Sequence, residues 1–412
     1  MTRPRLLLLG MGEMGRPYFD AAHRLGFAVT VLDRARRLDA LATRSRLEDD
    51  DRALPVEAVT DEEWYQAALG ASVPRPDAVL GFSEPHVIPA ALVAAELGLG
   101  GPGLRAAVIS RNKALQRAVF GARGIVQPEH RLSRGLEDAL KWSRSRFPAV
   151  VKPLAEAGSV GVEIVSGEPE LRRAVDGRRP PFLVERFVDG PEFSCETLVA
   201  DGEVRWWSVT EKVTSQPPFA VELEHHVPAR LEAGAALAIA ALAARTREVL
   251  GVAAGIMHVE ARLARGGPVL IEVAVRTPGD HIFDLVRLAT GVDLFEANVA
   301  ALAGIEPSVE RTVDGAACVW FPTPEPGVIA RVDGLDELAR LEGVAVAHVQ
   351  LAPGDEVPPL RSTLDRLDGV ILTASNRDEL DQRLAAVKAR LEIGVCRRAG
   401  EAHRSREENA RG

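Results

Sequence analysis

Two glutamates and an arginine at the end of a predicted β-hairpin form the strongest chemical signal in this chain of 412 residues. Glu260 and Glu272 lie on its two strands, 256–263 and 268–275, which an Arg-Gly-Gly turn joins. Two carboxylates on apolar strands repel each other unless a cation lies between them, and Mg²⁺ favours such oxygen ligands. Arg276 lies on the same strand face as Glu272 and could neutralise a developing negative charge. A metal site fits better than a solvent-facing strand, because apolar and polar residues do not alternate around Glu272.

Isolated lysines are the second signal, because arginine supplies nearly all of the 50 basic residues. A lysine kept in such a chain marks a position that favours a compact, flexible charge. Lys152 ends a predicted strand and precedes the small-residue loop 155–162, whose N–H groups could fold over phosphates. Lys113 begins a predicted helix. The loop is not a Walker A sequence, and a hairpin with a solvated lysine is the alternative.

A glycine turn near the start of the chain is the third signal. Gly10, Gly12 and Gly15 follow an apolar strand at 6–9 and precede a helix predicted for 17–25, and Asp33 ends the next strand. This spacing matches the dinucleotide-binding fingerprint, so NAD or NADP is one candidate ligand. The same turn suits another anion at a helix N-terminus, or a purely structural role.

The segment 185–193 is the fourth signal, because an extended backbone there could pair with a flat heterocycle while Glu192 reaches a ribose. An ordinary turn between strands is the alternative. The histidines are less specific: His225 and His226 could contact a substrate, or they could be plain loop residues. Neither a transition-metal histidine pair nor a serine or cysteine nucleophile has a credible context.

Composition excludes several classes of protein. The chain is 46% hydrophobic and carries a net charge of −9, which argues for folded domains and against nonspecific nucleic-acid binding. No uncharged apolar run reaches the length of about 18 residues that a membrane helix needs. Three widely spaced cysteines offer neither a disulfide framework nor a zinc site. A cytoplasmic protein is expected.

The elements that must position these residues divide the chain into parts. A strand, glycine turn, helix and second strand at its start predict a doubly wound α/β domain over 1–105. Further strands are expected near 147–152, 161–165, 182–186, 193–211, 218–227 and 318–322. Another is expected at 344–351, and long helices at 233–250 and 377–391. A polar tail from 397 to 412 is expected to be disordered.

The order of these parts resembles the ATP-grasp superfamily, and within it the carboxylate–amine ligases typified by bacterial L-amino-acid ligases. The likeness runs from the first α/β domain through the lysines, the glutamate strands and the turn at 279–282. It implies a multidomain α/β and α+β protein with an ATP-grasp fold. The implied divisions are a pre-ATP-grasp domain (1–105), a lid subdomain (106–186), a second subdomain with the metal site (187–305) and a C-terminal domain (306–396).

The resemblance also implies roles for single residues. Lys113 and Lys152 would bind the phosphates of ATP beneath the lid loop, and Glu192 would reach the ribose. Glu260 and Glu272 would hold Mg²⁺ or Mn²⁺, and Arg276, with Lys152, would be catalytic. The implied nucleotide set is Lys113, Lys152, Ser159, Val160, Glu185, Phe187, Val188 and Glu192. The implied substrate set is Glu84, Glu222, His225, Gly279, Asp280 and His281.

The implied reaction joins a carboxylate to an amine through an acyl phosphate and releases ADP and phosphate. Two amino acids are the default substrates, a natural-product acid fits equally, and a homodimer is compatible with the resemblance. One departure matters, because Ala274 stands where the superfamily often has Asn or Asp after the second metal glutamate. The alternatives are an ATP-binding protein with a decayed site and an oxidoreductase that uses the Gly10–Gly15 turn.

Overall fold

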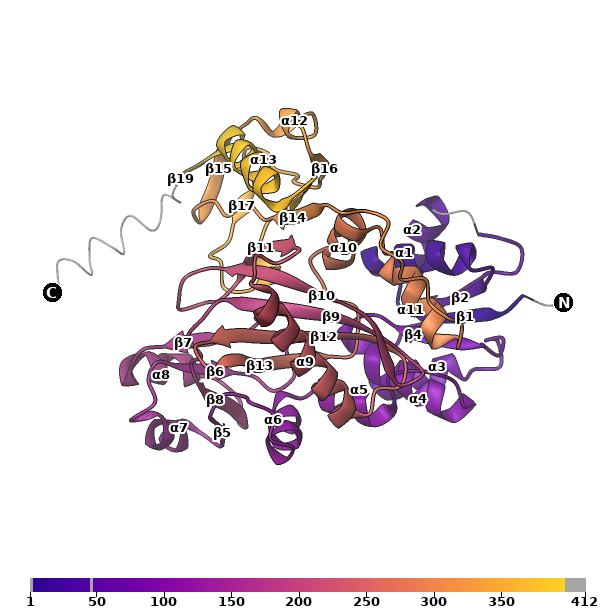
Figure 1. The fold of residues 1–412 in the computed structure, drawn as a ribbon, viewed down its shortest axis with the longest axis horizontal. Coiled ribbons are helices and arrows are strands. Elements are labelled where there is room, and N and C mark those ends of the chain that lie inside the picture. The colour runs from indigo at the N-terminus through magenta and orange to yellow at the C-terminus, as the bar shows by residue number, and fades with distance from the viewer. Residues whose placement is uncertain (1–2, 45–46, 397–412) are drawn as a thin grey trace.

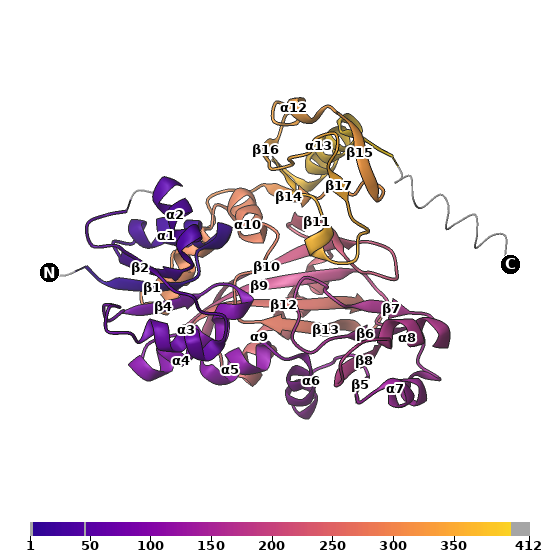
Figure 2. The same ribbon diagram turned by 180° about the vertical axis from the view of Figure 1, so that it is seen from behind.

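The computed structural model describes residues 3–44 and 47–396, so the polar tail expected at 397–412 lies outside the described residues. The N-terminal sheet and a small antiparallel sheet lie at opposite ends of the molecule, and a large central sheet joins them (Figures 1 and 2). The C-terminal segment forms the upper part of the molecule in both views. Among the described helices, none combines the length and the apolar character that a membrane crossing requires.

The N-terminal domain is a parallel sheet in the order β3-β2-β1-β4. Leu6 to Leu9 on its central strand are fully buried, which explains their continuous apolar run. The first helix begins at Gly12 and not at Pro17, because Gly10 and Gly12 take left-handed φ values that turn the chain directly into it. The elements are β1 (Arg5–Leu9), α1 (Gly12–Arg24), β2 (Ala28–Asp33), α2 (Ala35–Arg44), β3 (Arg52–Pro55), α3 (Asp61–Ala68), β4 (Ala78–Gly81), the short helix η1 (Glu84–His86) and α4 (Val87–Leu97).

The small antiparallel sheet has the order β5-β8-β6-β7. Two helices pack on it around a core that includes Val151, Leu171 and Phe182. The connecting helix α5 (Leu104–Ser110) packs against α4 and the central domain, and α6 (Lys113–Ala122) packs against α5 and the central domain. The sheet and its helices are β5 (His130–Ser133), α7 (Leu136–Ser143), β6 (Ala149–Lys152), β7 (Glu163–Val165), α8 (Glu168–Val175) and β8 (Phe182–Arg186).

The central sheet has the order β13-β12-β9-β10-β11-β14-β18-β16. Its last three strands come from the C-terminal segment, so the sheet crosses the boundary predicted at 305–306. The strand expected at 344–351 ends at Ala347, and the backbone beyond it is irregular. The strands are β9 (Glu192–Ala200), β10 (Glu203–Thr214), β11 (Glu222–Val227), β12 (Gly255–Ala264), β13 (Gly267–Ala274), β14 (Ala316–Trp320), β16 (Val344–Ala347) and β18 (Val370–Ala374).

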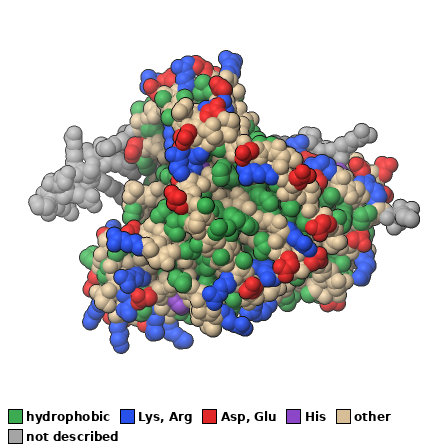
Figure 3. Space-filling model, in the orientation of Figure 1, with side chains coloured by type: hydrophobic (Ala, Val, Ile, Leu, Met, Phe, Trp, Pro, Cys, Tyr) green, Lys and Arg blue, Asp and Glu red, His purple; other side chains and the backbone are tan. Residues whose placement is uncertain are grey.

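Helices and a third sheet complete the molecule. The helix α9 (Ala233–Leu250) packs on the central sheet, on the face where Figure 3 shows hydrophobic side chains gathered over the middle among scattered charges of both signs. The third sheet has the order β17-β15-β19. The remaining C-terminal elements are β15 (Gly327–Asp333), α12 (Leu335–Leu338), β17 (Glu356–Val357), the short helix η2 (Thr363–Asp365), α13 (Arg377–Arg390) and β19 (Glu392–Cys396).

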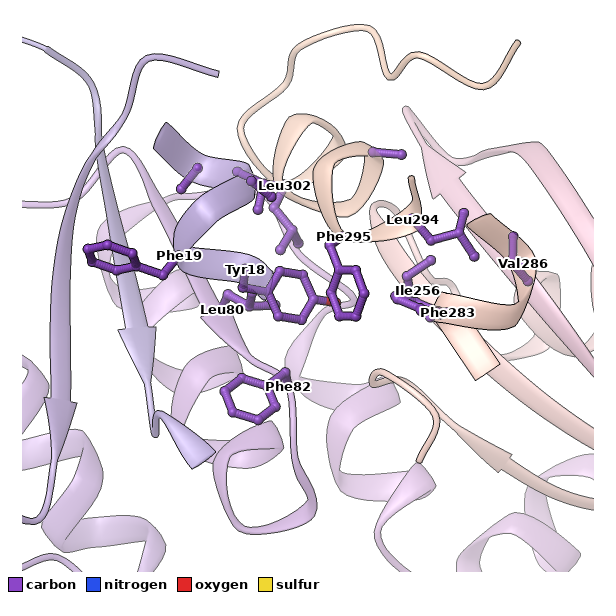
Figure 4. Packing of buried hydrophobic residues seen from close by; sticks show 14 of the residues in the cluster. Tyr18, Phe19, Leu80, Phe82, Ile256, Phe283, Val286, Leu294, Phe295 and Leu302 are labelled. Carbon is purple, nitrogen blue, oxygen red and sulfur yellow. The ribbon is translucent and has the colours of Figure 1, made fainter. Parts of the chain in front are cut away.

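The N-terminal domain is joined to the rest by a shared core. Helices α10 (Ile282–Thr290) and α11 (Leu294–Leu302) bring Phe295 against Tyr18 on α1, with ring centroids 5.0 Å apart (Figure 4). The Tyr18 hydroxyl lies 2.6 Å from Thr277 Oγ1 and accepts a hydrogen bond of 2.8 Å from Asn298 Nδ2. Thr277 directly follows Arg276, so this buried network sets the position of the predicted catalytic arginine relative to the N-terminal domain.

A buried charge cluster joins the small sheet to the central domain. Glu185 on β8 receives hydrogen bonds from Arg117 Nε (2.6 Å) and Nη2 (3.1 Å), and Lys152 Nζ on β6 lies 2.7 Å from it. Burial opposes the ionisation of Glu185, but the charges of Lys152 and Arg117 outweigh it and lower its pKa to about 2. Burial also lowers the pKa of Lys152, and Glu185 offsets this only in part.

Replacing Tyr18 by Phe removes two buried hydrogen bonds and leaves Thr277 and Asn298 without their partner. We expect the free energy of unfolding to fall by about 1–3 kcal/mol, measured by urea denaturation. Tyr65→Phe is the matched control, because the Tyr65 hydroxyl is exposed and makes only a long contact of 3.4 Å with Glu96. Equal losses in the two variants would show that the buried network adds no stability.

Glu185→Gln should destabilise the protein by about 3 kcal/mol at pH 7, since it leaves two cations buried without a carboxylate. The pKa of Glu185 is lower in the folded protein than its unfolded value of about 4.3. Its stabilising effect is therefore complete above that value and is lost as the pH falls toward 2. The difference in the free energy of unfolding between wild type and variant should be constant from pH 7 to 5 and should shrink below about pH 4.3. A difference that already shrinks above pH 5 in urea titrations would contradict this assignment.

Candidate active site

A cavity of about 140 Å³ lies between the small sheet and the central sheet. The loop 155–162, which connects β6 to β7, covers it, and residues of β12 and β13 also line it. Most of the predicted nucleotide and metal residues meet there. Those lining it are Lys113, Lys152, Ser159, Glu185, Phe187, Val188, Glu192, Glu260 and Glu272, together with the predicted substrate residue Glu222 and the predicted catalytic Arg276.

Register in the central sheet explains how distant residues meet in this cavity. Glu260 on β12 lies directly opposite Glu272 on β13, and Glu192 on β9 lies directly opposite Lys212 on β10. Glu222 begins the next strand, β11. The charged groups thus follow one another across five adjacent strands, which the chain order does not reveal.

Three glutamates on these strands surround one lysine. Lys212 Nζ lies 2.6 Å from Glu260, 3.1 Å from Glu222 and 3.3 Å from Glu192. Burial opposes the charge on Lys212, but the three carboxylates raise its pKa well above the usual range. One carboxylate oxygen from each glutamate lies within 4.8 Å of the others, so this group could hold a hard cation. The predicted metal residue Glu260 belongs to it and Glu272 does not.

Glu272 is paired separately with the predicted phosphate-binding residue Lys113. Lys113 Nζ lies 2.9 Å from Glu272 Oε1 and donates to the carbonyl of Glu156 in the covering loop at 2.6 Å. In the same loop, Ser159 has a φ of 59° and donates to the carbonyl of Ala220 at 3.1 Å. Val160 belongs to this loop but does not line the cavity.

A second polar group contacts Glu260, and its other members were not predicted as site residues. His258 Nδ1 lies 2.8 Å from the fully buried Glu196, and its Nε2 lies 3.3 Å from Glu260. Burial alone would lower the pKa of His258, but the two carboxylates raise it to about 9, so this imidazole is protonated. Lys212 and Glu196 thus belong to the site, and the only sequence signal for either was the rarity of lysine.

Arg276 is held at the edge of the cavity by a carboxylate from the N-terminal domain. Its Nε donates to Glu84 Oε1 at 2.7 Å, and its Nη1 donates to the carbonyl of Thr277 at 2.7 Å. Arg111 pairs with the other oxygen of Glu84. Burial opposes the ionisation of Glu84, but Arg276 and Arg111 together lower its pKa. The pairing joins a predicted substrate residue to the predicted catalytic arginine.

Two other predicted substrate residues, Asp280 and His281, face a different and larger cleft. This cleft, of about 1130 Å³, lies between the N-terminal glycine turn, α10 and the C-terminal segment, and Asp280 and His281 line it. Both have left-handed φ values, 58° and 60°, in the turn after Gly279. His225 lies beneath this turn, with its Nε2 3.0 Å from Asp280 Oδ2. Glu222 lines the smaller cavity, whereas Glu84, His225 and Gly279 line neither space, so the structure does not bring the predicted substrate residues together in one cavity.

The glycine turn faces the large cleft, but its geometry argues against a dinucleotide. Asp33, the residue expected to bind a ribose, is 1% exposed. Its two oxygens accept hydrogen bonds from the backbone N–H groups of Met11 (2.6 Å) and Arg34 (2.7 Å). A side chain at Gly10 would lie 2.1 Å from His86. The turn therefore needs its glycine for close packing.

Family models match three parts of the chain. An ATP-grasp N-terminal domain matches residues 19–101, an ATP-grasp domain matches 145–284, and an L-amino acid ligase C-terminal domain matches 319–395. The alanine–anticapsin ligase of Bacillus subtilis is 27% identical over 387 residues, which cover 82% of this chain and 81% of that one.

A second relative and a solved structure are also similar to this chain. An uncharacterized protein, y4rH, of Sinorhizobium fredii is 30% identical over 281 residues, and the match covers 66% of this chain and 58% of that protein. The crystal structure of an L-amino acid ligase from Bacillus licheniformis superposes with a TM-score of 0.78 at 24% identity. The superposition covers 96% of this chain and 100% of that one, which confirms the expected fold. The chain belongs to the ATP-grasp superfamily, and within it resembles the L-amino-acid ligases.

Proposed function

We propose that this protein is an ATP- and Mg²⁺-dependent ligase that joins a carboxylate to an amine through an acyl phosphate. The supporting observation is the meeting of Lys113, Lys152 and Arg276 with several carboxylates in a single covered cavity. Phosphoryl transfer needs positioning and charge neutralisation more than covalent help from the protein, and this set of residues can supply both. Enzymes of the ATP-grasp superfamily generally use ATP and a divalent metal ion.

The paired charges suggest how the nucleotide would bind. Lys113 and Lys152 each contact a carboxylate at 2.9 and 2.7 Å, and in the proposed complex they turn toward the phosphates instead. Ser159 in the covering loop would lie over those phosphates, and Val160 would contribute to the loop without lining the cavity. Glu185, Phe187 and Val188 frame the adenine at the far end, and Glu192 reaches the ribose. The loop belongs to the lid subdomain that we propose for residues 106–186.

The carboxylate oxygens suit a magnesium ion. Glu260 and Glu272 face each other in the register of β12 and β13, and Glu222 lies close to Glu260. Ala274 offers no ligand atom at the position where the superfamily often has Asn or Asp. Mg²⁺ usually keeps several waters, so two carboxylates and phosphate oxygens suffice to bind it. The ion would neutralise charge on the transferred phosphoryl group. A decayed site is the alternative, and the retained pairing of Arg276 with Glu84 speaks against it.

In the proposed reaction, the substrate carboxylate attacks the terminal phosphate of ATP and displaces ADP, which gives an acyl phosphate. The amine then attacks the acyl carbon, loses a proton and displaces phosphate, which leaves the amide. Arg276 stabilises the negative charge of both steps. Glu84, Asp280 and His281 contact the substrates, together with Glu222, His225 and Gly279. Two amino acids are the substrates we expect, as the name of the alanine–anticapsin ligase suggests. The protein would act on these small molecules in the cytoplasm, alone or as a homodimer.

Nucleotide binding distinguishes this proposal from an oxidoreductase. Isothermal calorimetry should show binding of ATP with Mg²⁺ and none of NAD or NADP. Lys152→Ala should weaken ATP binding by about tenfold or more, the cost of a lost charge-assisted hydrogen bond. Lys141→Ala is the control, since this exposed lysine on α7 lies outside the cavity. Binding of NAD alone would contradict the ligase proposal.

Catalytic variants test the roles of the metal and arginine residues. In an assay of ADP release with pairs of carboxylates and amines, Glu272→Gln should abolish turnover. Arg276→Ala should lower kcat by about 10²–10³-fold while the KM for ATP changes little, since its charge acts on the transition state. Full activity of Glu272→Gln would exclude it as a metal ligand. Equal losses in kcat and ATP affinity would show that Arg276 only binds nucleotide.

A further inference from the structure

A short strap in the C-terminal segment, residues 362–366, reaches the loop that covers the nucleotide cavity. Thr363 donates two hydrogen bonds to the carbonyl of Gly158 at the loop tip, from its backbone N at 3.0 Å and from its Oγ1 at 3.1 Å. The two residues are 205 positions apart in the chain. The tip of the loop is therefore held by a segment that contributes no residue to the lining of the cavity.

The strap is also anchored to both candidate substrate regions. Arg366, whose side chain is 5% exposed, donates to the carbonyl of Glu222 at 2.6 Å and to Asp280 Oδ1 at 2.5 Å. Its guanidinium carbon lies 3.8 Å from the ring centre of Phe321. One buried arginine thus connects the glutamate strand β11 with the turn that lines the large cleft.

The conformations of the strap and of the loop tip both favour the contact between Thr363 and Gly158. Ser362 and Asp365 form a reciprocal capping box that fixes the strap, with Ser362 N 2.8 Å from Asp365 Oδ2. On the other side, Gly158 has a φ of +63°, and a side chain there would lie 2.4 Å from Thr363 Oγ1. Only a glycine permits this close approach in this conformation.

The cavity beneath the loop is small for a nucleotide, which argues that the loop moves when one binds. About 140 Å³ remains beneath it, whereas pockets for small ligands usually have at least about 300 Å³. A nucleotide can enter only if the loop lifts, and the hydrogen bonds to Gly158 must then break. They reform when the loop closes again.

We propose that the strap is a latch that holds the loop closed over bound nucleotide, with Thr363 and Arg366 as positioning residues. The inference rests on the proposed function, because a closed loop protects an acyl phosphate from water. When the latch is weakened, water replaces the amine as the attacking group at the acyl carbon. The carboxylate is then regenerated, and ATP is converted to ADP and phosphate without amide formation.

The test uses the full chain and a fluorescent ATP analogue with Mg²⁺. Thr363→Val keeps the side-chain shape but removes the Oγ1 donor, and a hydrogen bond of ordinary strength changes an equilibrium by about three- to tenfold. Stopped-flow release of the analogue should accelerate by that factor. The ratio of ADP to amide should also rise above that of wild type. Leu364→Ala is the matched control, because this neighbouring side chain is 81% exposed.

Arg366→Lys is the second variant, since it keeps the charge but loses the planar fork that contacts two partners. It should also accelerate release. Release from Thr363→Val at the wild-type rate, with or without a lower melting temperature, would overturn the latch. Faster release in a protein that forms no amide from any substrate pair would keep the latch and overturn the ligase. Absence of nucleotide binding would overturn both.

Discussion

Charged groups taken out of water must be neutralised by partners, and this requirement organises the whole molecule. Lys152 is balanced by Glu185, Lys113 by Glu272, Lys212 by three glutamates, and Arg276 by Glu84. Two of these pairs join distant parts of the chain, because Lys113 and Glu272 are 159 positions apart and Glu84 and Arg276 are 192 positions apart. Removing one member would leave a buried charge without a partner, which costs more free energy than a lost surface ion pair. The candidate active site is therefore also a junction between domains.

The same pairs prepare the cavity for an anionic ligand that requires a metal. A lysine held by a carboxylate can exchange that partner for a phosphate without ever being buried alone. The freed carboxylate then needs a cation, which Mg²⁺ would provide. In the proposed complex, charge balance thus couples the binding of the nucleotide to the binding of the metal ion. Backbone contacts act on the same loop, since the carbonyls of Glu156 and Gly158 accept hydrogen bonds from Lys113 and Thr363.

Several features could be predicted because they depend on local sequence. The buried strands at 6–9 and 28–33, the helix at 233–250 and the hairpin carrying Glu260 and Glu272 were expected, and the structure contains them. The helix predicted from Pro17 was placed too late, since its true start depends on glycine φ values. The central sheet that runs across residue 306 was not expected, because strand order depends on contacts between distant segments.

By itself, the sequence determined which chemistry was available: a few lysines in a chain rich in arginine, acidic residues on apolar strands, and glycines at turns. It also determined the superfamily, through the order of these parts. Only the tertiary structure decided which charges meet. Glu192, Lys212, Glu222 and Glu260 converge because β9 to β12 are neighbours in one sheet, and Thr363 reaches Gly158 because the C-terminal strands extend that sheet. Side chains from separate strands become neighbours through register, a long-range property that local patterns do not encode.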